Sequence, residues 1–395
     1  MTTIGIGSSQ DPNPTLAFKE AAIMAKHQIN LPESDLVLIF STDEYPLDQN
    51  AFNTIQKILQ PKRSIYALTT GLIIPQGTAP RGVGILAISS KDIRFGISTR
   101  NNLNQTLLHE AGLRLGREAV TSLGTPKRQG FISFVSGPQK NQLLLRGLQE
   151  SLGHTLPIIG AISSGQIAKE SSLIALDGTT QESAAIGLLI GGTEPVIVAT
   201  RHGWQPLGRP RIITDAEGGI IRKIDGQPAI DLYSNYFPED LITMTPYKFR
   251  NLGLLYPLGI STDTPRTYYI RHITDILSDG SLSCQGDVAK GRTIYLMISD
   301  KDACRQAAHD AAMEVREKLN GHTPKMLLIF ESMARQRLLG RGASHEISLI
   351  KEIFGFATPV FGMYTYGELA PAKGSQKHTQ DTQLQSASIV IAAIG

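Results

Sequence analysis

The chain has few of the residues that stabilise secreted or metal-binding proteins, and it lacks long apolar runs. Its 395 residues include one tryptophan and only two cysteines, Cys284 and Cys304. Two cysteines at that spacing build neither a disulfide framework nor a thiolate metal site, which favours a reducing compartment. No apolar run approaches the roughly 20 residues that cross a bilayer, and the N-terminus does not resemble a signal peptide. We therefore expect a cytoplasmic protein without a membrane partner.

Charge is also sparse and nearly balanced. Lys and Arg number 38 against 35 Asp and Glu, so the net charge is +3, and charged residues make up 18% of the chain. This small excess, without a lysine or arginine tract, argues against a nucleic-acid partner. The Walker A, His-Glu-x-x-His and Cys-x-x-Cys motifs are missing, and we expect no cofactor and no metal. Apolar residues at 41% are enough for a packed core.

What the chain does contain is an internal repeat. An apolar run with a phenylalanine is followed by a helical stretch, a second apolar run and a glycine. The three copies cover residues 35–71, 130–165 and 325–367. The spacing from phenylalanine to glycine is 31, 31 and 37 residues, which indicates one supersecondary unit used three times. Gly71, Gly165 and Gly367 are therefore expected at equivalent turns.

Each copy is preceded by a strand and a helix and followed by another strand, which predicts β-α-β-α-β-β units at about 1–91, 92–192 and 292–395. The third unit is expected to begin with a strand at 293–299. Residues 193–291 break the pattern with short alternating runs and Asp-Gly turns, which are typical of β structure. We expect an α/β fold of three repeats. A mainly β insert should lie between the second and third repeats and dock without interrupting their sheets.

Small polar residues follow the second apolar run of the first two repeats. Ser163 and Ser164, before Gly165, loosely resemble a nucleophile elbow, but an elbow needs a helix directly after the serine. Here the chain continues into an apolar strand, which argues against serine hydrolysis. Thr70 and Gly71 occupy the matching loop. We expect these loop residues to act as secondary donors to a ligand.

The first strand of the third repeat ends near two candidate residues, Ser332 and Arg335. An arginine guanidinium offers a bidentate fork for a carboxylate or phosphate. Arg337 and Arg341, farther along, fit a solvated helix face instead. Arg335 is therefore the cation that we favour for a ligand.

The most distinctive string of the chain runs from Tyr364 to Glu368. Tyr364 and Tyr366, two positions apart, should lie on one face of a strand. Gly367 suits a close turn, and the Glu368 carboxylate could accept hydrogen bonds from an ammonium group. The alternative is that the tyrosines pack in the core and Glu368 is exposed.

These strings resemble the FIST sensory domain family (F-box and intracellular signal transduction). The segments that carry the resemblance are 36–40, 157–160, 224–233 and 361–371. It extends over an N-terminal FIST region, from about Ser34 to Ile230, and a C-terminal one from about Asp231 to the end. In terms of the repeats, we assign 1–192 to the N-terminal region, 193–291 to a bridging segment and 292–395 to the C-terminal region. Ser332 replaces a cysteine that the family tends to have before x-x-Arg.

The resemblance implies a protein that binds small ligands, with amino acids often proposed, and that feeds signalling outputs. We expect Arg335 to pair with a ligand carboxylate, Glu368 with an ammonium, and Tyr364 or Tyr366 to form the wall. The signalling partner would be a separate, unknown protein, and no catalytic residue is assigned. Two alternatives are a hydrolase of small amides at the repeat junction and a structural protein that binds no ligand.

Overall fold

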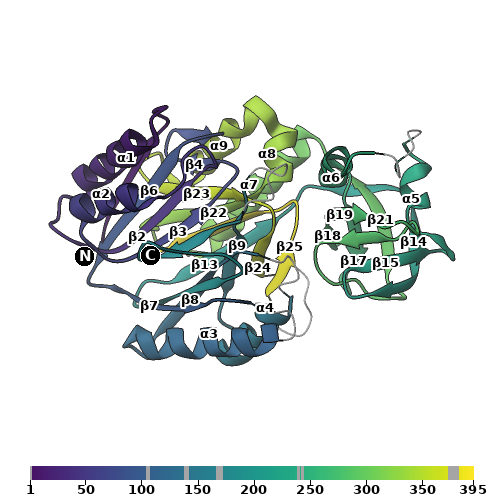
Figure 1. The fold of residues 1–395 in the computed structure, drawn as a ribbon, viewed down its shortest axis with the longest axis horizontal. Helices are drawn as coiled ribbons and strands as arrows, with labels where there is room; N and C mark the ends of the chain where they lie inside the picture. Colours follow the sequence, from purple (N-terminus) through teal and green to yellow (C-terminus); the bar gives the residue numbers. More distant parts are fainter. Residues whose placement is uncertain are drawn as a thin grey trace.

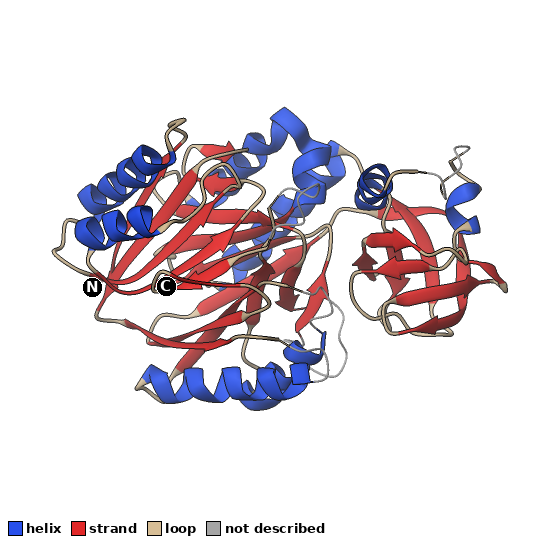
Figure 2. Cartoon of the chain, viewed as in Figure 1, coloured by secondary structure: helices blue, strands red, loops and turns tan. Residues whose placement is uncertain are grey.

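The computed structural model describes residues 2–103, 107–137, 142–165, 172–237, 241, 244–371 and 382–395. A large body of three mixed sheets lies beside a smaller body built on one antiparallel sheet (Figure 1). The helices of the large body lie on its outside and the strands fill its middle (Figure 2). The expected α/β class, with three repeats and a mainly β insert, is confirmed.

Each repeat contributes the same succession of elements. In the first repeat they are β1 (Thr2–Ser9), α1 (Pro14–Ile29), β2 (Ser34–Ser41), α2 (Gln49–Leu59), β3 (Pro61–Leu68), β4 (Leu72–Ile74), β5 (Gly77–Ala79) and β6 (Val83–Ser90). In the second they are β7 (Ile93–Arg100), α3 (Leu108–Leu123), β8 (Arg128–Val135), α4 (Gln142–Leu152), β9 (Ile158–Ile162), β10 (Ile174–Leu176), β11 (Thr179–Gln181) and β12 (Ala185–Gly192). In the third they are β13 (Val196–Arg201), α7 (Lys301–Lys318), β22 (Met326–Ser332), α8 (Met333–Leu339), α9 (Ala343–Phe354), β23 (Val360–Thr365), β24 (Glu368–Pro371), β25 (Thr382–Gln385) and β26 (Ile389–Ile394).

Local sequence explains where the first helix of a repeat begins. Asn13 precedes α1, and its side-chain oxygen accepts hydrogen bonds from the N–H groups of Thr15 and Leu16 at 3.0 and 3.3 Å. Pro14 occupies the first turn, where its missing N–H costs nothing. Asp300 caps α7 in the same way through the N–H of Ala303 at 2.7 Å.

The short hairpin of each repeat lies in the sheet of another repeat. The hairpin β4–β5 joins β23 of the third repeat, β10–β11 joins β3 of the first, and β24–β25 joins β9 of the second. The exchange is cyclic, so each six-stranded sheet takes two strands from a neighbouring repeat. In consequence, no repeat completes its sheet alone.

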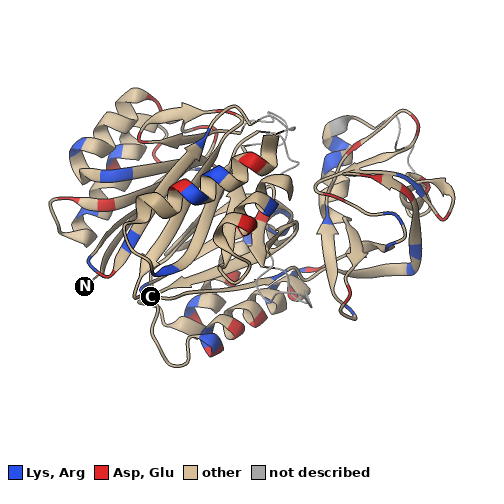
Figure 3. Ribbon diagram, turned by 90° about the horizontal axis from the view of Figure 1, so that it is seen from below, with Lys and Arg blue, Asp and Glu red and all other residues tan. Residues whose placement is uncertain are grey.

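The three sheets enclose a common apolar core. The phenylalanine that marks each repeat is fully buried there: Phe134 lies 5.8 Å from Phe40 and 5.9 Å from Phe330 between ring centroids. Phe40 also stacks on Phe361 at 4.9 Å. The opposite face of each sheet is covered by helices. Charged residues are seen on those helices and on the smaller body (Figure 3).

The third repeat begins earlier than its sequence pattern predicts. The strand expected at 293–299 forms β21 (Thr293–Ile298), which pairs with insert strands and not with β26. The strand that pairs with β26 is β13, at 196–201. The prediction that 293–299 forms the first strand of the third repeat is therefore wrong. The apolar pattern of a strand does not indicate which strand it pairs with. The insert enters the third repeat between β13 and α7.

The insert itself is largely β, as expected. Its elements are β14 (Gln205–Glu217), β15 (Ile220–Ile224), β16 (Gln227–Pro228), α5 (Asp231–Ser234), α6 (Pro246–Leu255), β17 (Leu258–Ser261), β18 (Tyr268–Arg271), β19 (Ile273–Ile276), β20 (Leu282–Cys284) and β21. The strands form one eight-stranded sheet. This sheet packs on its own apolar cluster, which includes Tyr233 and Phe249.

We predict that Phe134→Ala lowers the free energy of unfolding by about 3–5 kcal/mol, because it removes a ring that joins the cores of three repeats. Denaturant unfolding followed by circular dichroism measures this change. Phe356→Ala is the matched control, since that ring is 67% exposed and should matter little. Equal effects of the two substitutions would contradict the shared core.

Candidate functional site

Hydroxyl groups connect the three repeats where their parallel strands end. In each repeat, one hydroxyl donates a hydrogen bond to a main-chain carbonyl of a neighbouring repeat. The three donor–acceptor pairs are Thr69 to Tyr364 at 2.6 Å, Thr365 to Ile162 at 2.7 Å, and Ser163 to Leu68 at 3.0 Å. We call this cycle the hydroxyl ring. It holds the exchanged hairpins in register.

Two of the three expected glycines occupy equivalent turns at this ring. The carbonyls of Gly71 and Gly367 each accept a main-chain N–H from the next repeat at 2.9 Å. In the second repeat Leu173 takes this role, and its carbonyl accepts from the Leu68 N–H at 3.0 Å. The prediction that Gly165 occupies a turn equivalent to those of Gly71 and Gly367 is therefore wrong. Leu173 follows Ser163 by ten positions, whereas two positions suffice in the first repeat, so the second loop is longer.

Thr70 and Ser164 directly follow hydroxyl-ring residues. Their own side-chain oxygens are buried without a hydrogen-bond partner among the described residues. Tyr366 occupies the same position in the third repeat; it is 6% exposed, and its ring centroid lies 6.0 Å from that of His272. These three residues therefore occupy equivalent positions in the three repeats. Their contacts among the described residues do not indicate a shared ligand.

Arg335 is fully buried in a group of charged side chains. Its Nε donates to Glu331 at 3.0 Å, and its Nη2 donates to Glu346. The guanidinium also donates to the carbonyls of His202 at 2.8 Å and Cys304 at 3.0 Å. All three guanidinium nitrogens therefore have partners within the protein.

Two carboxylates face this single cation, so one of them needs a proton. Burial, together with the nearby charge of Glu331, raises the pKa of Glu346 well above its usual range. With Glu346 neutral, the charges of Arg335 and Glu331 balance. This arrangement is a structural ion pair with an added neutral acid.

The structure does not bring Arg335 and Glu368 together as an ion pair. Glu368 is fully buried, and one of its oxygens accepts from the Ser388 hydroxyl at 2.7 Å. Burial raises the pKa of Glu368 well above its usual range. Tyr364 is fully buried as well, and the Ser332 hydroxyl caps α8 by accepting from the Ala334 N–H at 3.3 Å.

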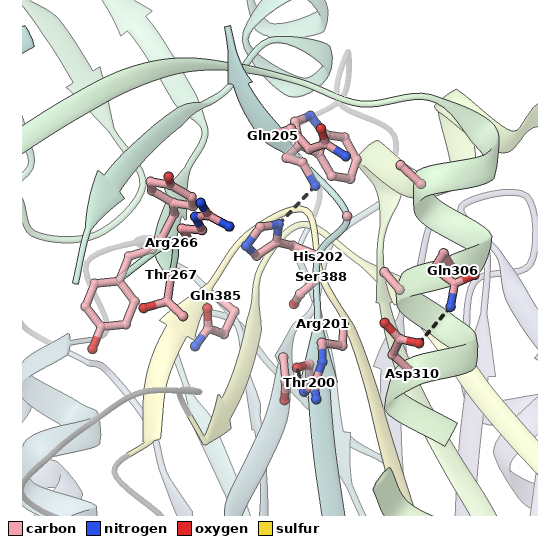
Figure 4. Close-up of a pocket in the computed structure, with 16 residues that line it drawn as sticks. Thr200, Arg201, His202, Gln205, Arg266, Thr267, Gln306, Asp310, Gln385 and Ser388 are labelled. Atoms are coloured by element: carbon pink, nitrogen blue, oxygen red, sulfur yellow. Dashed lines mark hydrogen bonds between the residues drawn. The ribbon is translucent and has the colours of Figure 1, made fainter. Parts of the chain in front are cut away.

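A cavity of about 360 Å³ lies where the insert meets the third repeat (Figure 4). Its walls come from the end of β13, the start of β14, the β17–β18 turn, one face of α7 and the β25–β26 turn. The lining residues are Thr200, Arg201, His202, Gly203, Trp204, Gln205, Arg266, Thr267, Tyr268, Tyr269, Ala303, Gln306, Ala307, Asp310, Gln385 and Ser388. The residues expected from sequence do not line it. Three of them contact lining residues: Arg335 donates to the His202 carbonyl, the Ser332 N–H donates to the Ser388 carbonyl, and Glu368 accepts from the Ser388 hydroxyl.

Opposite charges lie on two sides of the cavity. Arg266, on the insert, forms no ion pair with another described residue, and Asp310, on α7, accepts from Gln306 at 2.8 Å. Figure 4 shows these two side chains on opposite sides of the opening, with His202 between them. A small molecule with both charges would fit such a pair better than an ion of one sign.

His202 presents a neutral imidazole to the cavity. Its Nδ1 accepts from the Trp204 N–H at 3.0 Å, so Nε2 carries the proton. Burial of the ring, with Arg335 and Arg201 nearby, lowers the pKa of His202 to about 4. The ring therefore stays a donor through Nε2–H near neutral pH.

A second hollow, of about 470 Å³, lies between the first two repeats. Its lining includes Asp43, Tyr66 and Glu182. Both charged side chains among the described lining residues are acidic, so these residues offer no cation to a ligand carboxylate. Within the described residues no cluster of three His, Cys, Asp or Glu side chains suits a metal ion.

Sequence reasoning missed the cavity because its residues come from five separate segments. One segment of the sequence could have indicated it: the single tryptophan, Trp204, follows Arg201 and His202 closely. The hydroxyl ring had a clearer signal: a threonine precedes the turn glycine by two positions in both the first and the third repeat.

Sequence comparison decides the family. Residues 35–227 match the FIST N domain and residues 229–371 match the FIST C domain. The chain belongs to the FIST family. The boundary between the two FIST domains falls inside the insert, after β16, so it does not coincide with a repeat boundary.

This FIST protein also has relatives, some of them similar over nearly the whole chain. An uncharacterized protein of Mycobacterium tuberculosis is 24% identical over 384 residues, which cover 94% of this chain and 95% of the relative. An uncharacterized protein of Methanocaldococcus jannaschii is 24% identical over 180 residues, 43% of this chain and 34% of that protein. Both are described only as uncharacterized proteins, so neither indicates a ligand.

Two solved structures are similar along the whole chain. A cyanuric acid hydrolase from A. caulinodans has a TM-score of 0.38 at 6% identity and covers 100% of this chain and 99% of its own. A chorismatase has a TM-score of 0.37 at 9% identity and covers 100% and 98%. At these scores neither carries a conclusion about this FIST protein.

We predict that Arg335→Met lowers the free energy of unfolding by about 3–5 kcal/mol, because it leaves Glu331 as an uncompensated buried charge. Glu346→Gln should cost far less, since that acid is already neutral. Arg337→Met, on the exposed side of α8, is the matched control. Denaturant titration of the three variants tests the arrangement, and a large loss in the control would refute it.

Proposed function

We propose that this FIST protein is a sensor that binds a small zwitterion, of the amino-acid class, in the cavity between the insert and the third repeat. The observation that supports it best is the pair of opposite charges across that cavity. Arg266 would pair with the carboxylate of the ligand and Asp310 with its ammonium group. Each ligand charge would then have a partner of opposite sign.

Neutral polar side chains that line the same cavity support the proposal. The Nε2–H of His202 faces the opening (Figure 4). Gln385 is 7% exposed, and its side-chain amide makes no hydrogen bond with another described residue. The Thr200 hydroxyl is buried without a partner in the described part of the chain. Buried polar groups of this kind are normally satisfied, and a ligand would satisfy them here.

Aromatic and small apolar residues form the rest of the wall. Trp204 is fixed by a hydrogen bond from its indole N–H to the Leu255 carbonyl at 3.2 Å, and Tyr268 stands edge-on to Tyr295 at 5.5 Å. Ala303 and Ala307 leave room along α7. A volume of about 360 Å³ is at the lower end for ligand pockets, which suits a molecule the size of an amino acid.

The hydrolase alternative has weaker support. The Ser163 hydroxyl donates to the carbonyls of Leu68 and Leu173 at 3.0 and 2.7 Å. Its proton is committed to the hydroxyl ring and not to a general base.

A sensor needs only binding, so the output would pass to a separate signalling protein. No helix among the described residues has the length and apolar character of a membrane crossing.

We predict that Asp310→Asn weakens amino-acid binding about tenfold, because a hydrogen bond to a charged group is lost from a partly exposed site. Arg266→Gln should weaken it by a similar factor. Calorimetric titration of the parent protein with each standard L-amino acid identifies the ligand, and the variants follow with that ligand. Asp302→Asn, on the same helix but outside the cavity, is the control. Binding by no amino acid, or equal weakening in the control, would remove this site.

A further inference from the structure

One side of the cavity is polar but carries no charge of its own. It forms where the β25–β26 turn meets the end of β13, since Ile389 of β26 pairs with Arg201 of β13. The residues of this side are Gln385, Ser388 and Thr200, which lie below His202 in Figure 4. We call these three residues the cavity floor. The charged pair of the proposed site lies on the walls, so the floor is left to contact the side chain of an amino acid.

Gln385 is the floor residue whose side chain is unused. It is 7% exposed, and its amide makes no hydrogen bond with another described residue. By contrast Gln383, two positions earlier on the same strand, accepts from the Gln142 amide at 3.1 Å, outside the cavity. Buried amides normally have partners. Because a glutamine amide offers both donors and an acceptor, a ligand group that satisfies Gln385 needs a donor and an acceptor side by side.

The two hydroxyl groups of the floor are also neutral partners. The Ser388 hydroxyl is already used, since it donates to Glu368 at 2.7 Å. The Thr200 hydroxyl is buried without a partner in the described part of the chain, and a hydroxyl can both donate and accept. The floor thus offers hydrogen bonds to a ligand side chain without offering it a counter-charge.

Arg201, the charged lining residue beside the floor, is already paired. Its Nη2 donates to Glu314 on α7, and its Nη1 donates to the Thr200 carbonyl at 2.8 Å. A ligand side chain with a carboxylate would compete with Glu314 for this guanidinium, and one with an ammonium group would be repelled by it. A neutral polar side chain meets neither obstacle.

An apolar or aromatic ligand side chain suits the cavity less well. It would cover the Gln385 amide and leave it without a partner, which costs free energy. Trp204 is only 2% exposed, so its ring offers little surface for stacking. Tyr268 already packs edge-on against Tyr295, with 5.5 Å between the ring centroids. The polar floor therefore decides the class of side chain.

We infer that the ligand is an amino acid whose side chain ends in a carboxamide, and that Gln385 determines this specificity. A carboxamide carries a donor and an acceptor side by side, so it forms two parallel hydrogen bonds with the Gln385 amide. The Thr200 hydroxyl supplies a further neutral partner on the same floor. The inference rests on the proposed function, which puts an amino acid in this cavity, and it narrows the ligand to L-glutamine or L-asparagine.

Calorimetric titration of the parent protein with five amino acids tests the specificity. L-glutamine and L-asparagine carry the carboxamide, L-glutamate and L-aspartate replace it by a carboxylate of the same shape, and L-methionine is apolar and of similar size. We expect one carboxamide to bind about tenfold to a hundredfold more tightly than its acid and than L-methionine, because a buried amide left unpaired costs that factor. Gln385→Leu should weaken carboxamide binding by the same factor without weakening that of L-methionine.

Gln383→Leu, on the same strand but outside the cavity, is the matched control and should keep the preference. Gln385→Met is the second variant, in case the branched side chain disturbs folding. Tighter binding of an amino acid without a carboxamide would overturn the specificity, and the proposed site would stand if Asp310→Asn weakens that binding. A carboxamide preference that persists in both Gln385 variants would overturn the role of Gln385. Binding of no standard amino acid would reject the site and the specificity together.

Discussion

The hydroxyl ring is the interaction on which the rest of the fold depends. Thr69, Ser163 and Thr365 each pass a hydrogen bond to another repeat at the point where a hairpin leaves its own sheet. Each hairpin completes one neighbouring sheet, so loss of one link exposes an edge of that sheet, and unpaired sheet edges are unfavourable. The shared phenylalanine core beneath the ring then packs only when all three repeats are in place. The fold and the number of repeats are therefore coupled through hairpin exchange, to which the three hydroxyl groups contribute.

Much of the architecture could be predicted from sequence, because the core imposes a local pattern. Phe40, Phe134 and Phe330 recur since each faces the same centre, and Asn13 and Asp300 begin helices through contacts within a few residues. Hairpin exchange could not be predicted in this way. It joins β23 to β4, and no periodicity within either strand specifies the other. The same limit explains why β21 resembled the first strand of a repeat.

The candidate site was harder to predict because sequence does not distinguish a buried arginine from a ligand-binding one. Arg335 follows a strand end in either case, and the two acids that occupy it, Glu331 and Glu346, lie four and eleven positions away. The cavity joins residues from β13, α7, β25 and the insert, which only the fold brings together. From sequence, Arg335 and Glu368 were expected to bind the two charges of a zwitterion. In our proposal, Arg266 and Asp310 bind them instead.

The site lies where the repeats stop being alike. In the first repeat four residues connect strand to helix, from Gln10 to Asn13, whereas in the third the whole insert occupies that connection. Glu331 likewise stands where the aligned strands have Ser41 and Val135, so the buried group of charged side chains around Arg335 is confined to the third repeat. Three-fold repetition supplies the common core, and the interruption of the third repeat supplies the cavity in which our proposal places the ligand.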